Sequence, residues 1–266
     1  MIILYVSQLS RLVSHFKCKL LFLEYCKIMK NSALDNLQIF NSANTVIIPY
    51  IKRCDLESGI TVTASPLEQY TLDCFKAVRS ITDCMEQLHF SIELLSGYRT
   101  STSPDSMNRH DHIVFAIENY YLRITSVYDR CLRLINTLYN LVLPERDCKN
   151  STIVQNIHVK GSNIETSLKA LDKFTNKFRQ FRNSVAHNET YSEDDKLNTI
   201  ASYYFLEAQG ATEIIKFKHL YKTETDKYIK DKKAEFKIHL VEIEGLIIDF
   251  LSAVNTKYLG MKNKFI

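Results

Sequence analysis

Glycine and proline, the residues that most often interrupt regular structure, are rare in this chain: six glycines and four prolines are spread over 266 residues. Such sparse interruption is typical of long helices joined by few turns, and it argues against β-sandwiches and α/β nucleotide-binding folds. It also leaves no glycine-rich loop that would hold a phosphate group. The predicted fold class is therefore all-α, as an antiparallel bundle of four to six helices.

Apolar residues recur every three or four positions in five parts of the chain, as they do on the buried face of a helix. The clearest run begins at Pro66, a favoured first helical residue, and ends near Gly97, a favoured stop. Further helices are predicted over residues 109–143, 163–187 and 193–215, and in a last stretch around residues 240–254. The helical bundle is expected to span residues 66–266.

The first 65 residues depart from this pattern. Residues 1–28 are predicted to be an N-terminal extension, and two interpretations stay open: a peripheral amphipathic helix, or sequence upstream of a true start at Met29, which we favour. Residues 29–65 form a separate segment in which TVIIPYI and GITVTA are rich in β-branched residues. That composition is compatible with a small β-hairpin in which Pro49 lies on an edge strand.

Cysteine spacing and hydropathy bear on location. The seven cysteines show no CxxC or other metal-like pairing, a pattern that suits a reducing cytosol. No stretch of about 18 uninterrupted apolar residues occurs, so no membrane association through a spanning helix is expected. We therefore expect a cytoplasmic protein, and the net charge of +4 is compatible with an anionic partner.

The sequence FRNSVAHN, residues 181–188, places Arg182 and His187 five positions apart near the end of the predicted helix 163–187. At about 100° per residue, the apolar side chains of this helix gather on one side and face the core. A second face, an arc about 140° wide, carries Arg179, Arg182, Asn183, Ala186 and His187. Small Ala186 lies at the middle of this arc, where another surface can approach closely.

The run from Arg182 to His187 resembles the signature of HEPN domains, which is an arginine, four to six residues, then a histidine, often with a polar residue directly after the arginine. Together with the helical context, the resemblance covers about residues 66–259 and is similar to the HEPN domains of bacterial or archaeal defence systems. It implies a homodimer in which two motif helices face each other. It also implies a composite site that cleaves RNA without a metal ion or other cofactor, and an antitoxin or other regulatory protein as a further partner.

The resemblance assigns catalytic roles to Arg182, His187 and Asn183, and we add Arg179 as an RNA-binding residue. Histidine exchanges a proton near neutral pH, and arginine holds a phosphate with two hydrogen bonds while negative charge accumulates. Asn183 would orient the imidazole or the phosphate. The function that follows is a metal-independent endoribonuclease of a toxin–antitoxin or antiviral system. The alternatives are an inactive helical module that binds RNA or a partner protein, and an Arg and a His that merely stabilise a helix end.

Three other features carry weaker signals. The RHDHI sequence places His110 and His112 about 200° apart on a helix, so they are not expected to bind one metal ion. The stretch 216–237 holds eight lysines against four acidic residues, and we favour a solvated helix face over a grip on an RNA backbone. Tyr191 follows His187 by four residues, farther than the modified tyrosine of some toxin relatives.

Overall fold

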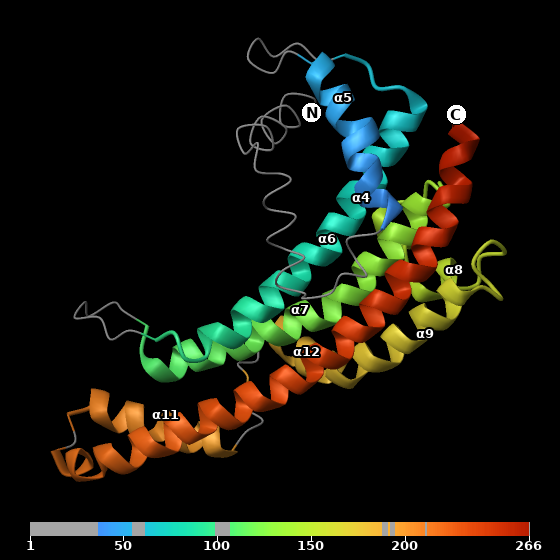
Figure 1. Ribbon diagram of the computed structural model, residues 1–266. Coiled ribbons are helices and arrows are strands. Elements are labelled where there is room, and N and C mark those ends of the chain that lie inside the picture. The colour runs from blue at the N-terminus through green and yellow to red at the C-terminus, as the bar shows by residue number, and fades with distance from the viewer. Residues whose placement is uncertain are drawn as a thin grey trace. The chain divides into compact units, whose positions relative to one another are not determined.

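All the regular structure in the described part of the chain is helical (Figure 1). The computed structural model describes residues 37–54, 62–98, 107–187, 191, 195–210 and 212–265. The three longest helices are α6 (Pro66–Leu94), α7 (Arg109–Leu138) and α12 (Lys218–Lys262). The predicted all-α fold is therefore confirmed, with no strand in these ranges.

Shorter elements flank the three long helices. Before α6 come α4 (Gln38–Ser42), a π-helical turn (Ala43–Ile47) and α5 (Ile48–Arg53). Between α7 and α12 lie a 3₁₀ turn (Glu145–Asp147), α8 (Asn150–Ile153), α9 (Asn163–Thr175), a 3₁₀ turn (Asn176–Phe178), α10 (Arg179–Ala186), α11 (Asp195–Ala208) and a 3₁₀ turn (Thr212–Phe217). A last 3₁₀ turn (Asn263–Phe265) follows α12.

Helix α6 begins where the sequence predicted, at Pro66, and a reciprocal pair of hydrogen bonds fixes that start. The backbone N–H of Ser65 donates to Glu68 Oε2 (2.8 Å), and the N–H of Glu68 donates to Ser65 Oγ (3.3 Å). This arrangement is a capping box, in which two donors without helical partners are satisfied at once. The Ser65 N–H, with the neighbouring Arg53 guanidinium, holds the pKa of Glu68 below its ordinary value.

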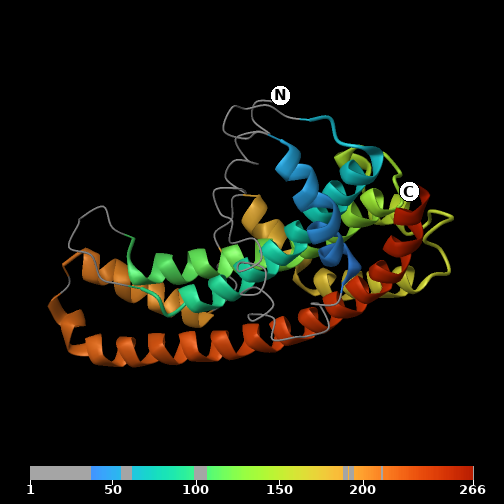
Figure 2. The same ribbon diagram turned by 45° about the horizontal axis from the view of Figure 1, so that its top comes forward.

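Contacts between residues divide the chain into two compact units. Unit 1 comprises its described residues up to Ile81, together with Asp129–Lys169 and Leu246–Ile266. In both ribbon views α5 lies beside the first part of α6 (Figures 1 and 2), and α4 meets the end of α12, where Lys262 Nζ donates to Ser42 Oγ (3.0 Å). Tyr70 is stacked against the rings of Tyr258 (5.9 Å between centroids) and Phe265 (4.6 Å). This aromatic stack, in which Tyr70 and Tyr258 are buried, joins α6 to the end of α12 and the 3₁₀ turn that follows it.

The predicted β-hairpin is wrong, because residues 43–53 are helical. Ile39, Ile47 and Tyr50 are buried, so the apolar side chains of this segment cover unit 1 as parts of a helix. Pro49 is the second residue of α5 and directly follows the π-helical turn Ala43–Ile47. Tertiary burial therefore outweighs the β preference of the TVIIPYI sequence. Residues 62–64 of the second predicted strand are not in a strand, and its other half (59–61) and all of residues 1–28 lie outside the described residues.

Unit 2 comprises residues 82–128 and 170–245. Its core includes Leu88, Ile124, Phe174, Phe236 and other apolar side chains that are almost fully buried. A row of polar side chains on α7 pairs with α6 in this unit: Asn119 Nδ2 donates to Ser91 Oγ (2.7 Å), and Arg123 Nη1 donates to Gln87 Oε1 (2.6 Å). The polar row thus joins two packed helices.

The boundaries of the later helices differ from the predicted ones. The predicted helix 163–187 is divided by the 3₁₀ turn Asn176–Phe178 into α9 and α10. The predicted helix 193–215 ends earlier, at Ala208, and Gly210 follows in a left-handed conformation (φ +72°) that favours glycine. Most of the charged stretch 216–237 belongs to α12, which runs unbroken from Lys218 to Lys262. The proposed cap at Ser192 lies outside the described residues.

Cysteine and hydropathy patterns agree with a packed helical protein. The five cysteines within the described residues are free thiols, and burial raises the pKa of the Cys74 thiol to about 12. Among the described residues, none of the helices has both the length and the apolar character needed to cross a membrane.

Candidate functional site

Helix α10 carries the Arg-His motif and exposes its polar residues. Arg179, Arg182, Asn183, Ala186 and His187 are all exposed, as expected for one face of a helix. Arg182 Nη1 donates a hydrogen bond to Asn183 Oδ1 (3.2 Å), so two of the predicted site residues are in direct contact. The structure therefore brings the four predicted polar site residues together on one solvent-facing surface, which we call the motif face.

His187 ends the helix. Its backbone N–H donates to the carbonyl oxygens of Asn183 (3.1 Å) and Ser184 (3.2 Å), and its own φ and ψ (−101° and 27°) leave the α-helical region. The imidazole is thus attached to the last hydrogen-bonded turn. A side chain at this position is held at its Cα while its ring stays accessible to a ligand.

A cluster of aromatic rings supports the motif face from behind. The ring of Phe181 stacks on Tyr121 of α7 with 4.6 Å between centroids and 14° between planes. Tyr121 also contacts Phe178 (6.1 Å) and Tyr191 (5.7 Å). These ring contacts hold α10 against α7 through the side chains of Phe178 and Phe181. The motif face is therefore backed by packed aromatic rings.

Tyr191 is part of this cluster and is only 6 % exposed. Its backbone N–H donates to Glu118 Oε1 of α7 (3.0 Å). The buried ring packs against the core and does not line the motif face, so this conformation does not offer the tyrosine to a modifying enzyme. The burial of Tyr191 therefore gives no support to a role as the modified tyrosine of some toxin relatives.

A second histidine, His239 of α12, packs against the cluster. The centroid of its ring lies 4.8 Å from that of Phe178, with 63° between the two ring planes. Burial lowers the pKa of His239, and the nearby carboxylates of Glu235 and Glu242 oppose that effect. The neutral imidazole is therefore favoured in the folded protein.

The RHDHI segment has a structural role. His110 Nδ1 lies 3.1 Å from Asp111 Oδ1, whereas His112 Nε2 lies 2.6 Å from the carbonyl oxygen of Leu94 and its ring is near Tyr98. The two imidazoles thus have different partners, as their helical spacing predicted. In the described ranges, no three His, Cys, Asp or Glu side chains are grouped as metal ligands would be.

The sequence did not point to the residues behind the motif. Tyr121, Phe236 and His239 come from helices distant in sequence, and the 3.6-residue period marks them only as buried or partly buried. Glu118 likewise gives no sequence signal for its contact with the backbone of residue 191. Their relation to α10 depends on tertiary packing.

A family comparison supplies the class of this protein. Residues 62–247 match a family model described as Cthe2314-like HEPN, and this match covers more than half of the chain. The chain is therefore a HEPN protein, as the Arg-His motif and helical context predicted. Within that class it belongs to the Cthe2314-like HEPN family. Comparisons with curated proteins and with solved structures gave no match.

Proposed function

We propose that this HEPN protein is a metal-independent endoribonuclease that acts as a homodimer. The observation that carries the proposal is the motif face, on which Arg182, Asn183 and His187 are exposed together with Arg179. A surface histidine and two arginines on one helix suit a substrate that is large, polyanionic and approached from solvent. RNA has these properties.

In the proposed reaction a ribose 2′-OH attacks the adjacent phosphorus. One His187 imidazole accepts the 2′-OH proton or, when protonated, donates a proton to the departing 5′ oxygen. A new O2′–P bond forms while the P–O5′ bond breaks, which yields a 2′,3′-cyclic phosphate and a free 5′-OH. Arg182 stabilises the charge that gathers on the phosphate oxygens, and Asn183 orients either the phosphate or the imidazole. Arg179 binds a neighbouring phosphate of the RNA.

The homodimer would supply both proton-transfer groups. Two motif faces related by a two-fold axis place two imidazoles and two guanidinium groups around one phosphodiester. Ala186, exposed at the middle of the face, leaves room for the helices to cross closely. Family membership supports this arrangement, since HEPN domains often dimerise and bind RNA.

The biological setting we propose is a toxin–antitoxin or antiviral system in the cytoplasm. An uncontrolled ribonuclease is harmful to its own cell, so an antitoxin or other regulatory protein is the expected partner. Such a partner would act most directly by covering the motif face.

The decisive experiment measures RNA cleavage in the presence of EDTA. Purified wild-type protein is expected to cleave RNA, whereas Arg182→Ala and His187→Ala should each reduce the rate about a hundredfold or more, because a positioned acid–base group contributes roughly 10²–10⁴-fold. The matched controls are Arg146→Ala and His219→Ala, which replace exposed residues of the same types outside the motif face. Both controls should retain the wild-type rate.

Two results would contradict the proposal. Cleavage that survives both motif substitutions would show that another site, or a contaminating enzyme, cuts the RNA. A folded wild-type protein that binds RNA or a partner without any cleavage would instead support the inactive binding module. Mass spectrometry of the products tests the chemistry separately, since a 2′,3′-cyclic phosphate is the expected end.

A further inference from the structure

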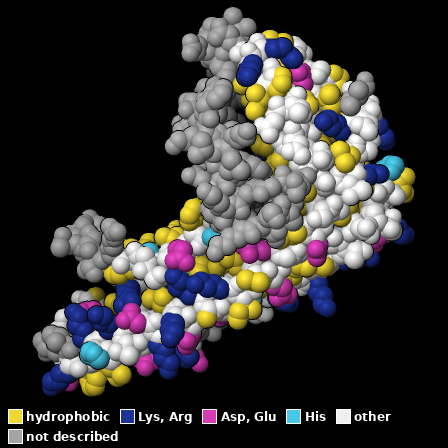
Figure 3. Space-filling view, in the orientation of Figure 1, with side chains coloured by type: hydrophobic (Ala, Val, Ile, Leu, Met, Phe, Trp, Pro, Cys, Tyr) yellow, Lys and Arg dark blue, Asp and Glu magenta, His cyan; other side chains and the backbone are white. Residues whose placement is uncertain are grey.

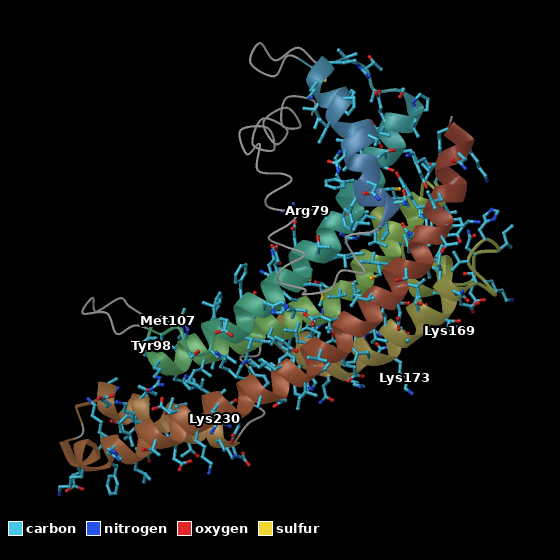
Figure 4. All side chains as sticks on the ribbon, viewed as in Figure 1. Arg79, Tyr98, Met107, Lys169, Lys173 and Lys230 are labelled. Carbon is cyan, nitrogen blue, oxygen red and sulfur yellow. The ribbon has the colours of Figure 1, made fainter. Side chains whose placement is uncertain are left out.

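An open cleft with basic walls lies in unit 2, apart from the residues of the motif face. It has a volume of about 570 Å³ and is lined by residues that include Ser96, Arg109, Asp226, Lys230, Lys233 and Lys237. Figure 4 labels Lys230 on α12, and it labels Tyr98 and Met107 just beyond the end of α6 and just before the start of α7. We call this feature the basic cleft.

Three polar contacts hold the walls of the basic cleft together. Arg109, the first residue of α7, forms an ion pair with Asp226 of α12. Lys233 of α12 reaches α6, where its Nζ lies 3.1 Å from Glu93 Oε2 and 2.9 Å from Ser96 Oγ. The side chain of Lys233 is 19 % exposed and that of Arg109 is 22 % exposed, so both cations are partly withdrawn from water. These pairs link α12 to both helices of the opposite wall.

Two further cations of the cleft have no ion-pair partner among the described residues and are available to a ligand. Lys230 and Lys237 are exposed on the same side of α12, and within the described residues neither ammonium group has an ion-pair partner. Seven residues separate them, which corresponds to about 10 Å along a helix with a rise of 1.5 Å per residue. The cleft therefore presents a row of three lysines, in which Lys233 lies between the unpaired Lys230 and Lys237.

The charges around the cleft do not cancel. Four cations (Arg109, Lys230, Lys233 and Lys237) face two carboxylates (Glu93 and Asp226), both of which are already paired. Elsewhere on the α11 and α12 part of this unit, lysine and arginine side chains are interspersed with acidic ones (Figure 3). A cleft with unpaired cations in a row is suited to an extended anion.

The stretch 216–237 is thus more than a solvated helix face. Lys218 is paired with Glu207 and Lys232 is buried against Glu235, so the lysines of this stretch have different roles. Only the part that faces α6 and α7 lines the basic cleft. Sequence alone does not distinguish these lysines, because their pairing depends on helices distant in the chain.

We propose that the basic cleft binds the sugar–phosphate backbone of RNA at a place separate from the motif face. Among the described residues no aromatic ring lines the cleft, so the contacts that those residues offer would be to phosphates and would hold the strand without reading its sequence. The choice of RNA over other polyanions rests on the proposed function. The cleft would increase the affinity for long substrates over short ones.

The test measures binding of a fluorescent single-stranded RNA by anisotropy at several salt concentrations. All proteins carry His187→Ala, so that cleavage does not remove the ligand. Adding Lys230→Ala and Lys237→Ala should weaken binding about tenfold at low salt. It should also lower the slope of log affinity against log salt by about 1.4, because each lost phosphate contact on a single strand contributes about 0.7.

The matched control replaces Lys216 and Lys222, two exposed lysines of the same stretch outside the cleft. It removes the same charge and should leave affinity near that of the His187→Ala parent. An equal loss of RNA affinity in both double variants would show a general charge effect and overturn the cleft proposal. The proposal would also be overturned if neither double variant changed RNA affinity, or if the His187→Ala parent did not bind RNA. Circular dichroism confirms that each variant is folded.

Failure of this proposal is distinguishable from failure of the proposed function. If wild-type protein cleaves RNA through His187 while the cleft variants bind normally, only the cleft proposal falls. If the cleft variants lose RNA binding but the wild type never cleaves RNA, the cleft proposal stands and the catalytic proposal falls.

Inorganic phosphate as a competitor separates a single-anion pocket from an extended groove. Only a single-anion pocket would be blocked by millimolar phosphate, and that result would contradict a site for the RNA backbone.

Discussion

At the scale of single residues, two histidines of unit 2 lie in opposite environments. His187 is exposed at the end of α10, where its imidazole is open to a ligand. His239 is partly buried against Phe178 and Phe236, where burial disfavours its protonated form. The first environment leaves the ring accessible from solvent, whereas the second makes the support of the motif face sensitive to acid.

His239 should make the protein less stable in mild acid. Its folded-state pKa is lowered from an ordinary value of 6.5, so the unfolded chain takes up the proton first as the pH falls. The free energy of unfolding therefore decreases from about pH 6.5 downward, toward the lowered pKa of the folded state. His239→Gln removes this titration, and its urea midpoint should fall less between pH 7.5 and 5.5 than that of the wild type.

The exposed His219 on the same helix is the control for this experiment. His219→Gln should leave the pH dependence close to that of the wild type. Identical pH profiles for His239→Gln and the wild type would show that other groups cause any loss of stability in acid. Activity is not needed for this measurement, so it is independent of the proposed reaction.

At the scale of helices, the hydrogen bonds between α6 and α7 determine how the two helices align in unit 2. Arg123 donates to Gln87 Oε1 at 2.6 Å, while its Nε atom is buried and has no hydrogen-bond partner among the described residues. The guanidinium group is therefore already short of acceptors. Losing Gln87 would leave more of its donors unsatisfied, which is costly for a charged group away from water.

Gln87→Leu should destabilise the protein by about 1–3 kcal/mol, because it leaves the partly buried guanidinium of Arg123 without its acceptor. Replacing Arg123 by Met in the same protein should recover part of that loss, because the unsatisfied guanidinium is then absent. Urea unfolding of the two single variants and the double variant measures this coupling. Gln69→Leu, at an exposed position of the same helix, should change stability by less than about 0.5 kcal/mol. Strictly additive effects would contradict the coupling.

The positions of the helices were largely predictable from the sequence, but the turns that divide a predicted helix were not. Pro66 and the apolar period located α6 because a local cap and a buried face both favour helix there. The 3₁₀ turn Asn176–Phe178 changes the backbone only slightly, so the apolar pattern runs through it unbroken. The TVIIPYI segment was misread because burial of Ile47 and Tyr50 decides its structure.

For the candidate site, the exposed face of Arg182, Asn183 and His187 follows from helical periodicity alone. The support beneath it does not. The stack of Phe181 on Tyr121 joins residues 60 positions apart, and local sequence carries no information on such a pairing. The same holds for the basic cleft, where Lys233 meets Glu93 across the helices of unit 2.

At the scale of the whole molecule, the proposed activity depends on self-association. A single motif face offers one imidazole, whereas the reaction requires an acceptor and a donor of protons. We therefore expect the purified protein to sediment as a dimer. The dimer contact should centre on Ala186, the smallest side chain of the motif face.

Ala186→Trp should shift the protein from dimer to monomer in sedimentation velocity, because an indole ring cannot be accommodated at a close helix crossing. RNA cleavage should fall in parallel, since the composite site is lost. Ala208→Trp places the same ring at an exposed alanine at the end of α11 and should leave both properties unchanged. A stable dimer with Trp at position 186 would mean that the subunits meet elsewhere.

The division of the chain into two units has a practical consequence. Each unit is assembled from separate stretches of sequence, and α6, α7 and α12 each contribute residues to both. No continuous fragment contains one unit without part of the other, so a trimmed expression clone would expose apolar surface that the full chain covers. Deletion mapping is therefore a poor way to locate activity in this protein, and point substitutions in the intact chain are the informative tool.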